Sequence, residues 1–212
     1  MSDAIKEFFP TIKRGPFKCL RNYEGQVASE YIATQKNSKG DIYDCAVYEA
    51  WLDMCRTVPG AGKEKKRQCE KARETAASEL RRYFSGKPKA TAEAFEGWIG
   101  SALSNVSAPT DLTIGQAQKI LNMAFKYLYC CEDIRSKYEK HFTYCHMPLD
   151  SFTLNWYKKN CAAVKYDGTV WSKITDVSMY FNIQKEIREK LGGKDVLLQE
   201  FSIWQKEKEA AE

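Results

Sequence analysis

The sequence predicts an all-α fold, a single compact domain of about eight to ten helices. The periodic segments between turn signals are mostly about 12–24 residues long, which suits helices and exceeds the length of typical strands. The six prolines and twelve glycines stand mostly between these segments. Strand-like alternation is almost absent, and its best candidate, residues 163–171, predicts at most a minor hairpin.

Turn residues and N-cap residues set the boundaries that we expect for the helices. We expect helices at about residues 3–13, 24–36, 41–57, 62–85, 90–105, 113–131, 133–145, 150–160, 176–191 and 195–208. Asp41, and Asp150 or the adjacent Ser151, are suitable N-caps, because their side chains accept hydrogen bonds from free backbone N–H groups. Thr113 followed by Gln116 three residues later predicts a capping box.

Length and composition favour one domain of 212 residues, in which residues 1–40 form a more loosely attached N-terminal region and about 41–208 form the helical core. The chain is 43% hydrophobic and 29% charged, so it can fill a core and keep a charged surface. No apolar run approaches the roughly 20 residues that cross a bilayer, and the first residues lack the layout of a secretory signal. We therefore expect a cytoplasmic protein with no membrane role.

The eight cysteines include no CxxC pair, and we expect most of them to be reduced and to pack as small hydrophobic side chains. Residues 130–161 hold four of them together with both histidines. Because zinc prefers Cys and His ligands, Cys131, His141, Cys145 and Cys161 are a candidate metal site, although their spacing matches no compact zinc pattern. The sequence therefore predicts no metal and no cofactor.

The same region admits two catalytic interpretations beside a structural one. Cys145, His146 and Asp150 supply a thiol, a base and an orienting acid, yet adjacent residues on a helix point about 100° apart. His146 with Asp150, or with a distant acid such as Glu200, would suit proton transfer in a phosphodiester hydrolase. In the structural interpretation, which is the more economical, Pro148 ends one helix and Asp150 caps the next.

The segment Lys63–Lys89 carries the positive charge of the chain. It holds ten Lys or Arg against four Glu, a net charge of +6, whereas the whole chain is +5. Its apolar stripe and the basic face opposite are typical of a surface that binds phosphate backbones or an acidic partner. The alternative is a solvated helix whose charges pair at i,i+3 and i,i+4 spacing. The candidate binding residues are Lys63, Lys66, Arg67, Lys71, Arg73, Arg81 and Arg82.

The segment 113–131 predicts a central helix, because apolar residues cover well over half of its circumference. The remaining polar stripe consists of Gly115, Lys119, Asn122 and Lys126. Its two lysines lie two turns apart, about 10.5 Å along the axis. The stripe either points into a groove that holds phosphate or carboxylate, or is the face that the helix shows to water. The glycine at its head permits another backbone or a ligand to approach closely.

A single acid near the C-terminus also lies among apolar positions. Glu200 lies among Leu198, Phe201 and Trp204, so we expect its carboxylate to be partly buried. A buried acid needs a partner, and the candidates are Lys119, Lys126 and His146.

The combination of AQKILNMAFKYLYC, CHMPLDSFTLNWY and WSK, with a Glu and a Trp near the C-terminus, resembles small bacterial and mobile-element proteins. The resemblance covers roughly the C-terminal half of the chain. That group has no known activity, so the resemblance implies no site residues. It does imply a bacterial or phage origin.

Three functions fit these observations, and we expect the first, a non-enzymatic binding protein. It would engage a nucleic acid or a nucleoprotein partner through the basic helix, with Lys119, Asn122 and Lys126 as further contacts. A phage or mobile-element inhibitor of a host defence system would have these properties. The second is a phosphodiester hydrolase that uses His146 and Asp150 with Lys119, Asn122 and Glu200. The third is a plain protein-interaction module.

Overall fold

The computed structural model describes residues 40–60, 62–86, 89–161, 168–193 and 195–212. These residues contain α-helices, two short 3-10 helices and no strand, so the all-α prediction is confirmed. The α-helices are α3 (Ile42–Met54), α4 (Gly62–Ser85), α5 (Ala92–Ser107), α6 (Ile114–Cys130), α7 (Glu132–Phe142), α8 (Ser151–Asn160), α9 (Val177–Lys190) and α10 (Val196–Glu209). The 3-10 helices are η3 (Cys55–Thr57) and η4 (Trp171–Lys173).

Some sequence predictions fall on residues that the structure leaves undescribed. The helices expected at 3–13 and 24–36, and with them nearly all of the N-terminal region (residues 1–40), lie outside the described residues. The same holds for most of the hairpin candidate at 163–171, whose last residue, Trp171, begins η4. Within the described ranges, every helix is too short or too polar to span a membrane.

Local side-chain caps explain where three of the helices begin. Asp41, Thr113 and Asp150 each form a capping box at the start of α3, α6 and α8. At α8 the Asp150 carboxylate accepts from the backbone N–H groups of Phe152 and Thr153 at 2.9 and 3.0 Å. The Thr153 hydroxyl in turn accepts from the Asp150 N–H at 2.9 Å. Each box satisfies backbone donors that the first helical turn leaves unpaired, so these predicted caps are confirmed.

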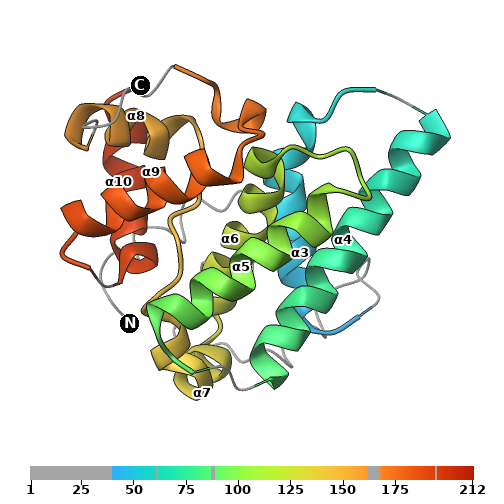
Figure 1. Cartoon of the computed structure of the whole chain (residues 1–212), viewed down its shortest axis with the longest axis horizontal. Helices are drawn as coiled ribbons and strands as arrows, with labels where there is room; N and C mark the ends of the chain where they lie inside the picture. The colour runs from blue at the N-terminus through green and yellow to red at the C-terminus, as the bar shows by residue number, and fades with distance from the viewer. Residues whose placement is uncertain (1–39, 61, 87–88, 162–167, 194) are drawn as a thin grey trace.

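Helix α6 is the centre of the described structure. It packs against α3, α5, α7 and η4, and it also contacts α4 and α9. Figure 1 shows α3, α4 and α5 gathered on one side of the molecule and α8, α9 and α10 on the other. Every residue from Gly115 to Leu128 is buried, which confirms the predicted central position of this helix.

An aromatic cluster fills the core between α4, α5, α6 and α7. The ring of Phe125 on α6 lies at its centre and is fully buried. Its ring contacts, at centroid distances of 5.4–6.2 Å, are with Tyr83, Phe84, Phe95, Trp98 and Phe142. Tilted and edge-to-face rings of this kind combine a large buried apolar area with favourable ring geometry.

The chain between α7 and α8 differs from the prediction. We expected a helix to about residue 145, ended by Pro148, but α7 ends at Phe142 and residues 145–149 are not helical. Pro148 therefore lies within an already non-helical segment and does not end the helix. Residues 145–149 are buried, and side chains of α6 and α9 bind the backbone of Met147 and Leu149. Because these long-range hydrogen bonds replace helical ones, local sequence rules missed the segment.

Gly115 lies where η4 crosses the start of α6. Its N–H donates to the carbonyl of Ile174 at 2.9 Å, and the Thr113 hydroxyl donates to the carbonyl of Ser172 at 2.9 Å. A Cβ atom placed on Gly115 would lie 1.8 Å from the carbonyl oxygen of Trp171. The close approach predicted for this glycine is therefore confirmed, and the group that approaches is another part of the backbone.

We expect Gly115→Ala to lower the free energy of unfolding by about 1–3 kcal/mol, because η4 must move away from α6 to admit the methyl group. Urea unfolding followed by circular dichroism measures the change. Gly97→Ala on α5 is the control, since a Cβ there meets nothing within 4 Å. That control is expected to gain about 0.5–1 kcal/mol from the better helix propensity of alanine. Equal losses in the two variants would contradict the explanation.

Candidate functional site

The polar stripe of α6 faces other helices and not water. Lys119, Asn122 and Lys126 are 4%, 1% and 1% exposed, so neither the groove nor the water-facing surface that the sequence left open is observed. The stripe meets polar side chains from the 145–150 segment, α9 and α10, and we call this contact the polar seam. The polar seam consists of Gln118, Lys119, Asn122, Lys126, His146, Asp150, Tyr180, Gln184, Glu200 and Trp204.

The first ion pair of the seam lies near the start of α6. Lys119 Nζ donates to the Asp150 carboxylate at 2.8 Å, and Trp204 Nε1 on α10 donates to the same oxygen at 3.1 Å. Burial raises the pKa of Asp150, but the ammonium of Lys119 and the backbone donor of Thr153 outweigh burial and hold that pKa below its usual value. Asp150 therefore caps α8 and links α6, α8 and α10 through a carboxylate that stays ionised.

The second ion pair is the more deeply buried. Lys126 Nζ lies 2.6 Å from the Glu200 carboxylate, with the two side chains 1% and 0% exposed. The same ammonium lies 4.6 Å from the ring centroid of Phe201 and 5.6 Å from that of Trp204. Burial raises the pKa of Glu200 above its usual value, and Lys126 only partly offsets this effect. Glu200 was predicted to be partly buried with Lys119, Lys126 or His146 as its partner; the structure buries it fully and selects Lys126.

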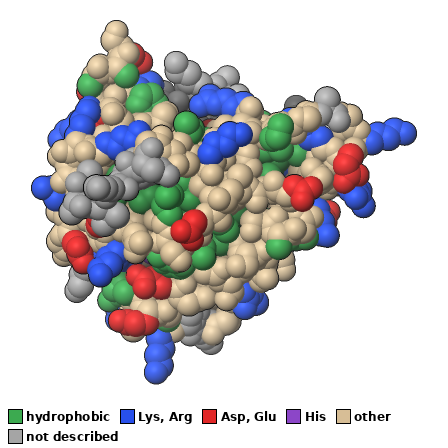
Figure 2. Space-filling model, turned by 45° about the horizontal axis from the view of Figure 1, so that its top comes forward, with side chains coloured by type: hydrophobic (Ala, Val, Ile, Leu, Met, Phe, Trp, Pro, Cys, Tyr) green, Lys and Arg blue, Asp and Glu red, His purple; other side chains and the backbone are tan. Residues whose placement is uncertain are grey.

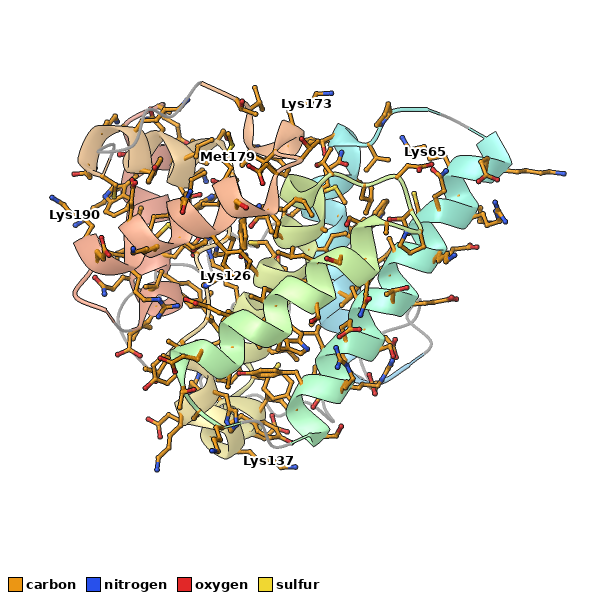
Figure 3. All side chains as sticks on the ribbon, in the orientation of Figure 1. Lys65, Lys126, Lys137, Lys173, Met179 and Lys190 are labelled. Atoms are coloured by element: carbon orange, nitrogen blue, oxygen red, sulfur yellow. The ribbon has the colours of Figure 1, made fainter. Side chains whose placement is uncertain are left out.

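Figure 3 contrasts this lysine with others on the surface. Lys126 lies inside the molecule among the helices, whereas Lys137, Lys173 and Lys190 are drawn at its edge. A cation in an apolar interior requires a carboxylate and aromatic faces to compensate for the lost hydration. The polar seam supplies both, so Lys126 stabilises the packing of the interior and is not a surface contact for a partner.

A chain of neutral hydrogen bonds lies between the two ion pairs. His146 Nδ1 lies 2.8 Å from the Tyr180 hydroxyl, which lies 3.0 Å from Asn122 Nδ2. Asn122 Nδ2 also donates to Gln118 Oε1 at 3.0 Å. Gln118 and Gln184 bind the backbone of Leu149 and Met147 through both their N–H and carbonyl groups.

The structure makes the cysteine-based hypotheses difficult to sustain. Burial raises the pKa of the Cys145 thiol well above its usual value, and its Sγ donates to the carbonyl of His141 at 3.6 Å. A catalytic thiol needs a depressed pKa and access to substrate. Among the described residues no three His, Cys, Asp or Glu gather so as to hold a metal, so Cys131, His141, Cys145 and Cys161 do not form a metal site. The described cysteines are reduced thiols, namely Cys45, Cys55, Cys69, Cys130, Cys131, Cys145 and Cys161.

The residues of the predicted hydrolase come together, but inside the core. His146 is 1% exposed and packs against the ring of Phe95 at 5.0 Å. Burial and the nearby Arg188 lower the pKa of His146 well below its usual value. Lys119 and Asn122 point at other seam residues. This arrangement favours a structural role over proton transfer to a bound phosphodiester.

The basic face of α4 is smaller than the sequence predicts. Arg81 turns toward α3 and binds Asp41 at 2.7 Å and also Asp44, while Arg73 lies over the ring of Tyr48 at 5.5 Å. Arg82 binds Glu79 within α4. All three were predicted to bind a partner. Arg73 and Arg81 instead turn to groups of α3 and its cap, whereas Arg82 pairs along its own helix and stays 59% exposed.

The cations that remain available lie in the first turns of α4. Lys63, Lys66, Arg67 and Lys71 are exposed, and we call them the basic helix end. Arg67 pairs with Glu64 at 2.9 Å, Lys66 approaches Glu70 at only 4.0 Å, and within the described chain no ion pair involves Lys63 or Lys71. In Figure 2 this region of the molecule projects at the right-hand end, with basic side chains outermost and acidic ones between them. The nearby Lys65 donates to the Val58 carbonyl at 2.6 Å.

Sequence reasoning missed several members of the seam. Gln118, Tyr180, Gln184 and Trp204 were not singled out, although each is buried or half-buried and hydrogen-bonded. One signal was present: Gln184 falls beside Ile183 and Ile187 on the apolar face of α9. A glutamine at such a position needs a buried partner.

Comparisons with known proteins add no assignment. No family model, no curated protein and no solved structure matches the chain. Function must therefore be argued from the residues and contacts described above.

Proposed function

We propose that this protein is a non-enzymatic binding protein that contacts the phosphate backbone of a nucleic acid through the basic helix end. One observation carries the proposal: the four cations project from the body of the molecule, whereas Arg73 and Arg81 of the same helix are turned inward. Within the described chain no ion pair involves Lys63 or Lys71, so an external partner can approach both ammonium groups.

Charge and spacing support a phosphate partner. Residues 62–71 hold five cations, including Lys65, against Glu64 and Glu70, which leaves a net charge of +3 on these turns. Lys63 and Lys71 are eight residues apart, about 12 Å along the helix axis. Lysine and arginine side chains spaced over such a length bind phosphates without reading bases, so binding is sequence-independent and weakens with salt.

The polar seam argues against the hydrolase as the main function. Its candidate catalytic groups are buried and bonded to other residues of the seam, whereas a general base must reach a proton of the substrate. The plain protein-interaction module is the outcome expected if nucleic acid does not bind. A cytoplasmic location, a bacterial or phage origin and a role against host defence stay predictions from the sequence.

The test is a charge reversal with a matched control. We expect Lys63→Glu/Lys66→Glu/Lys71→Glu to raise the Kd for a nonspecific duplex by at least about tenfold near 50 mM salt. The slope of log K against log salt is expected to fall by about one for each phosphate that the variant no longer binds. Fluorescence anisotropy with a labelled duplex measures both quantities.

The control changes three exposed lysines elsewhere by the same total charge. Lys140→Glu/Lys173→Glu/Lys185→Glu alters α7, η4 and α9 and leaves the basic helix end intact. It is expected to change the Kd much less than the α4 variant. Equal losses in both variants, or no binding by the unaltered protein at low salt, would refute the proposed contact.

A further inference from the structure

The hydrogen-bond donors and acceptors along the seam favour one arrangement around His146, the one that gives every hydrogen of Asn122 Nδ2 and of the Tyr180 hydroxyl an acceptor. The backbone N–H of Leu149 donates to Gln118 Oε1 at 3.1 Å, so this oxygen is an acceptor. Asn122 Nδ2 must then donate to it, and the second hydrogen of the same amide nitrogen points to the Tyr180 hydroxyl. Among the described residues the Tyr180 hydroxyl has only these two hydrogen-bonding neighbours, Asn122 and His146, so its own hydrogen finds an acceptor only at His146 Nδ1.

His146 is therefore an acceptor at Nδ1 and carries its hydrogen on Nε2. We propose that the chain His146–Tyr180–Asn122–Gln118 is a proton-sensitive latch, which holds α9 and the 145–149 segment against α6 and opens when His146 is protonated. A second proton would go to Nδ1, where it would meet the hydroxyl hydrogen of Tyr180. Two donors would then face each other across a contact that is 2.8 Å long.

The described residues around His146 are mainly aromatic rings, and none of them is a carboxylate hydrogen-bonded to the imidazole. The rings of Phe95 on α5 and Phe181 on α9 pack on His146 at centroid distances of 5.0 and 6.0 Å. His146 Nε2 has no hydrogen-bond partner among the residues that the structure describes.

Among the described residues, the one charged group that acts appreciably on His146 is a cation and not a counter-charge. Arg188 on α9 is a cation that further opposes protonation of His146. Cys145 and Tyr180 stay neutral, because burial raises their pKa values. The carboxylate of Glu96 on α5 contributes to the raised pKa of Tyr180. Lys119 and Lys126 on α6 are paired with Asp150 and Glu200.

The direction of the pH effect follows from the pKa of His146. Burial lowers this pKa below its usual value of 6.5 in the closed state, whereas an opened, hydrated His146 titrates near 6.5. The open state therefore binds more protons, and opening is favoured as the pH falls below 6.5. The raised pKa of Glu200 favours the closed state as the pH falls, which opposes the effect of His146. The pKa of Asp150 is lowered, so protonation of Asp150 favours opening only at lower pH.

Thiol labelling detects the opening, because one buried cysteine adjoins the latch and another lies far from it. Cys145 adjoins His146, and Cys45 lies in α3, away from the latch; both are fully buried. With 4,4′-dithiodipyridine as the probe, rates at each cysteine are read by peptide mass spectrometry and divided by those of the urea-unfolded chain. We expect the Cys145 rate to rise up to about tenfold per pH unit below pH 6.5, while Cys45 stays protected.

Variants of the two histidines, the only ones in the chain, complete the test. His146→Gln keeps a polar group but does not titrate, so Cys145 is expected to stay protected at low pH. His141→Gln is the matched control and is expected to label as the unaltered protein does. If both cysteines become reactive at the same pH, the transition is general unfolding and the latch is refuted.

A direct measurement covers the case in which His146→Gln does not fold. The imidazole resonances of the two histidines are followed by NMR in the unaltered protein, with His141→Gln used to assign them. We expect His146 to remain neutral in the closed state and to titrate only together with the exposure of Cys145. An ordinary titration near pH 6.5 with Cys145 still protected would overturn the proposal.

Discussion

Replacing Lys126 by methionine is expected to lower the free energy of unfolding by about 3–5 kcal/mol. Methionine fills nearly the same volume but leaves the carboxylate of Glu200 fully buried without its cation. The cost arises from this uncompensated charge and not from a cavity. Urea unfolding at neutral pH, with the slope of the transition held fixed between variants, measures it.

Two controls separate the buried charge from other effects. Lys159→Met breaks a comparable ion pair to Glu207 at 2.9 Å, but that lysine is 54% exposed, so a loss below about 1 kcal/mol is expected. The double variant Lys126→Met/Glu200→Leu removes both charges and is expected to recover most of the stability. A double variant as unstable as the single one would show that the site depends on the lysine for another reason.

The loss caused by Lys126→Met should also depend on pH. Burial already raises the pKa of Glu200, and removal of the cation raises it further. A group whose folded-state pKa is raised contributes stability that decreases as the pH rises through that value. The variant is therefore expected to differ least from the unaltered protein in acid and most at alkaline pH.

Phe125→Ala is expected to cost about 3–5 kcal/mol, because it removes the fully buried ring at the centre of the aromatic cluster. Five other rings lie against Phe125, so its loss leaves a cavity that several helices border. Phe152→Ala on α8 is the control, since Phe152 is half-buried and packs on Trp204 at 5.5 Å. That change is expected to cost at most about half as much.

Urea unfolding of both phenylalanine variants measures the difference. A loss below about 1 kcal/mol for Phe125→Ala would mean that α4, α5 and α7 close around the missing ring. It would contradict the expectation that the core between α4, α5, α6 and α7 depends on this ring.

The positions of the helices were largely predictable because their signals are local. Asp41, Thr113 and Asp150 each cap the next helix through residues two or three positions away, and the structure shows all three caps. The buried character of α6 was also predictable, because it follows from the composition of a single helix. The end of α7 was not predictable, since the next segment is held by Gln118 and Gln184 from other helices.

The candidate site was predicted in its residue types but not in its position. The sequence singled out Lys119, Asn122 and Lys126 as one stripe and His146 as a candidate partner of Asp150 or Glu200. It did not reveal that Tyr180 connects His146 to Asn122. Nor did it show that Arg73 and Arg81 turn toward α3, because their partners belong to another helix.

By itself, then, the sequence determined the all-α class, the starts of three capped helices, and the set of polar residues that a central helix must place somewhere. Only the tertiary structure decided that this stripe meets Asp150, Tyr180 and Glu200 and not water. The physical reason is the distance along the chain over which each kind of interaction acts. Capping and helical periodicity act within a few residues, whereas the partner of a buried charge is chosen by the packing of helices that lie far apart in the chain.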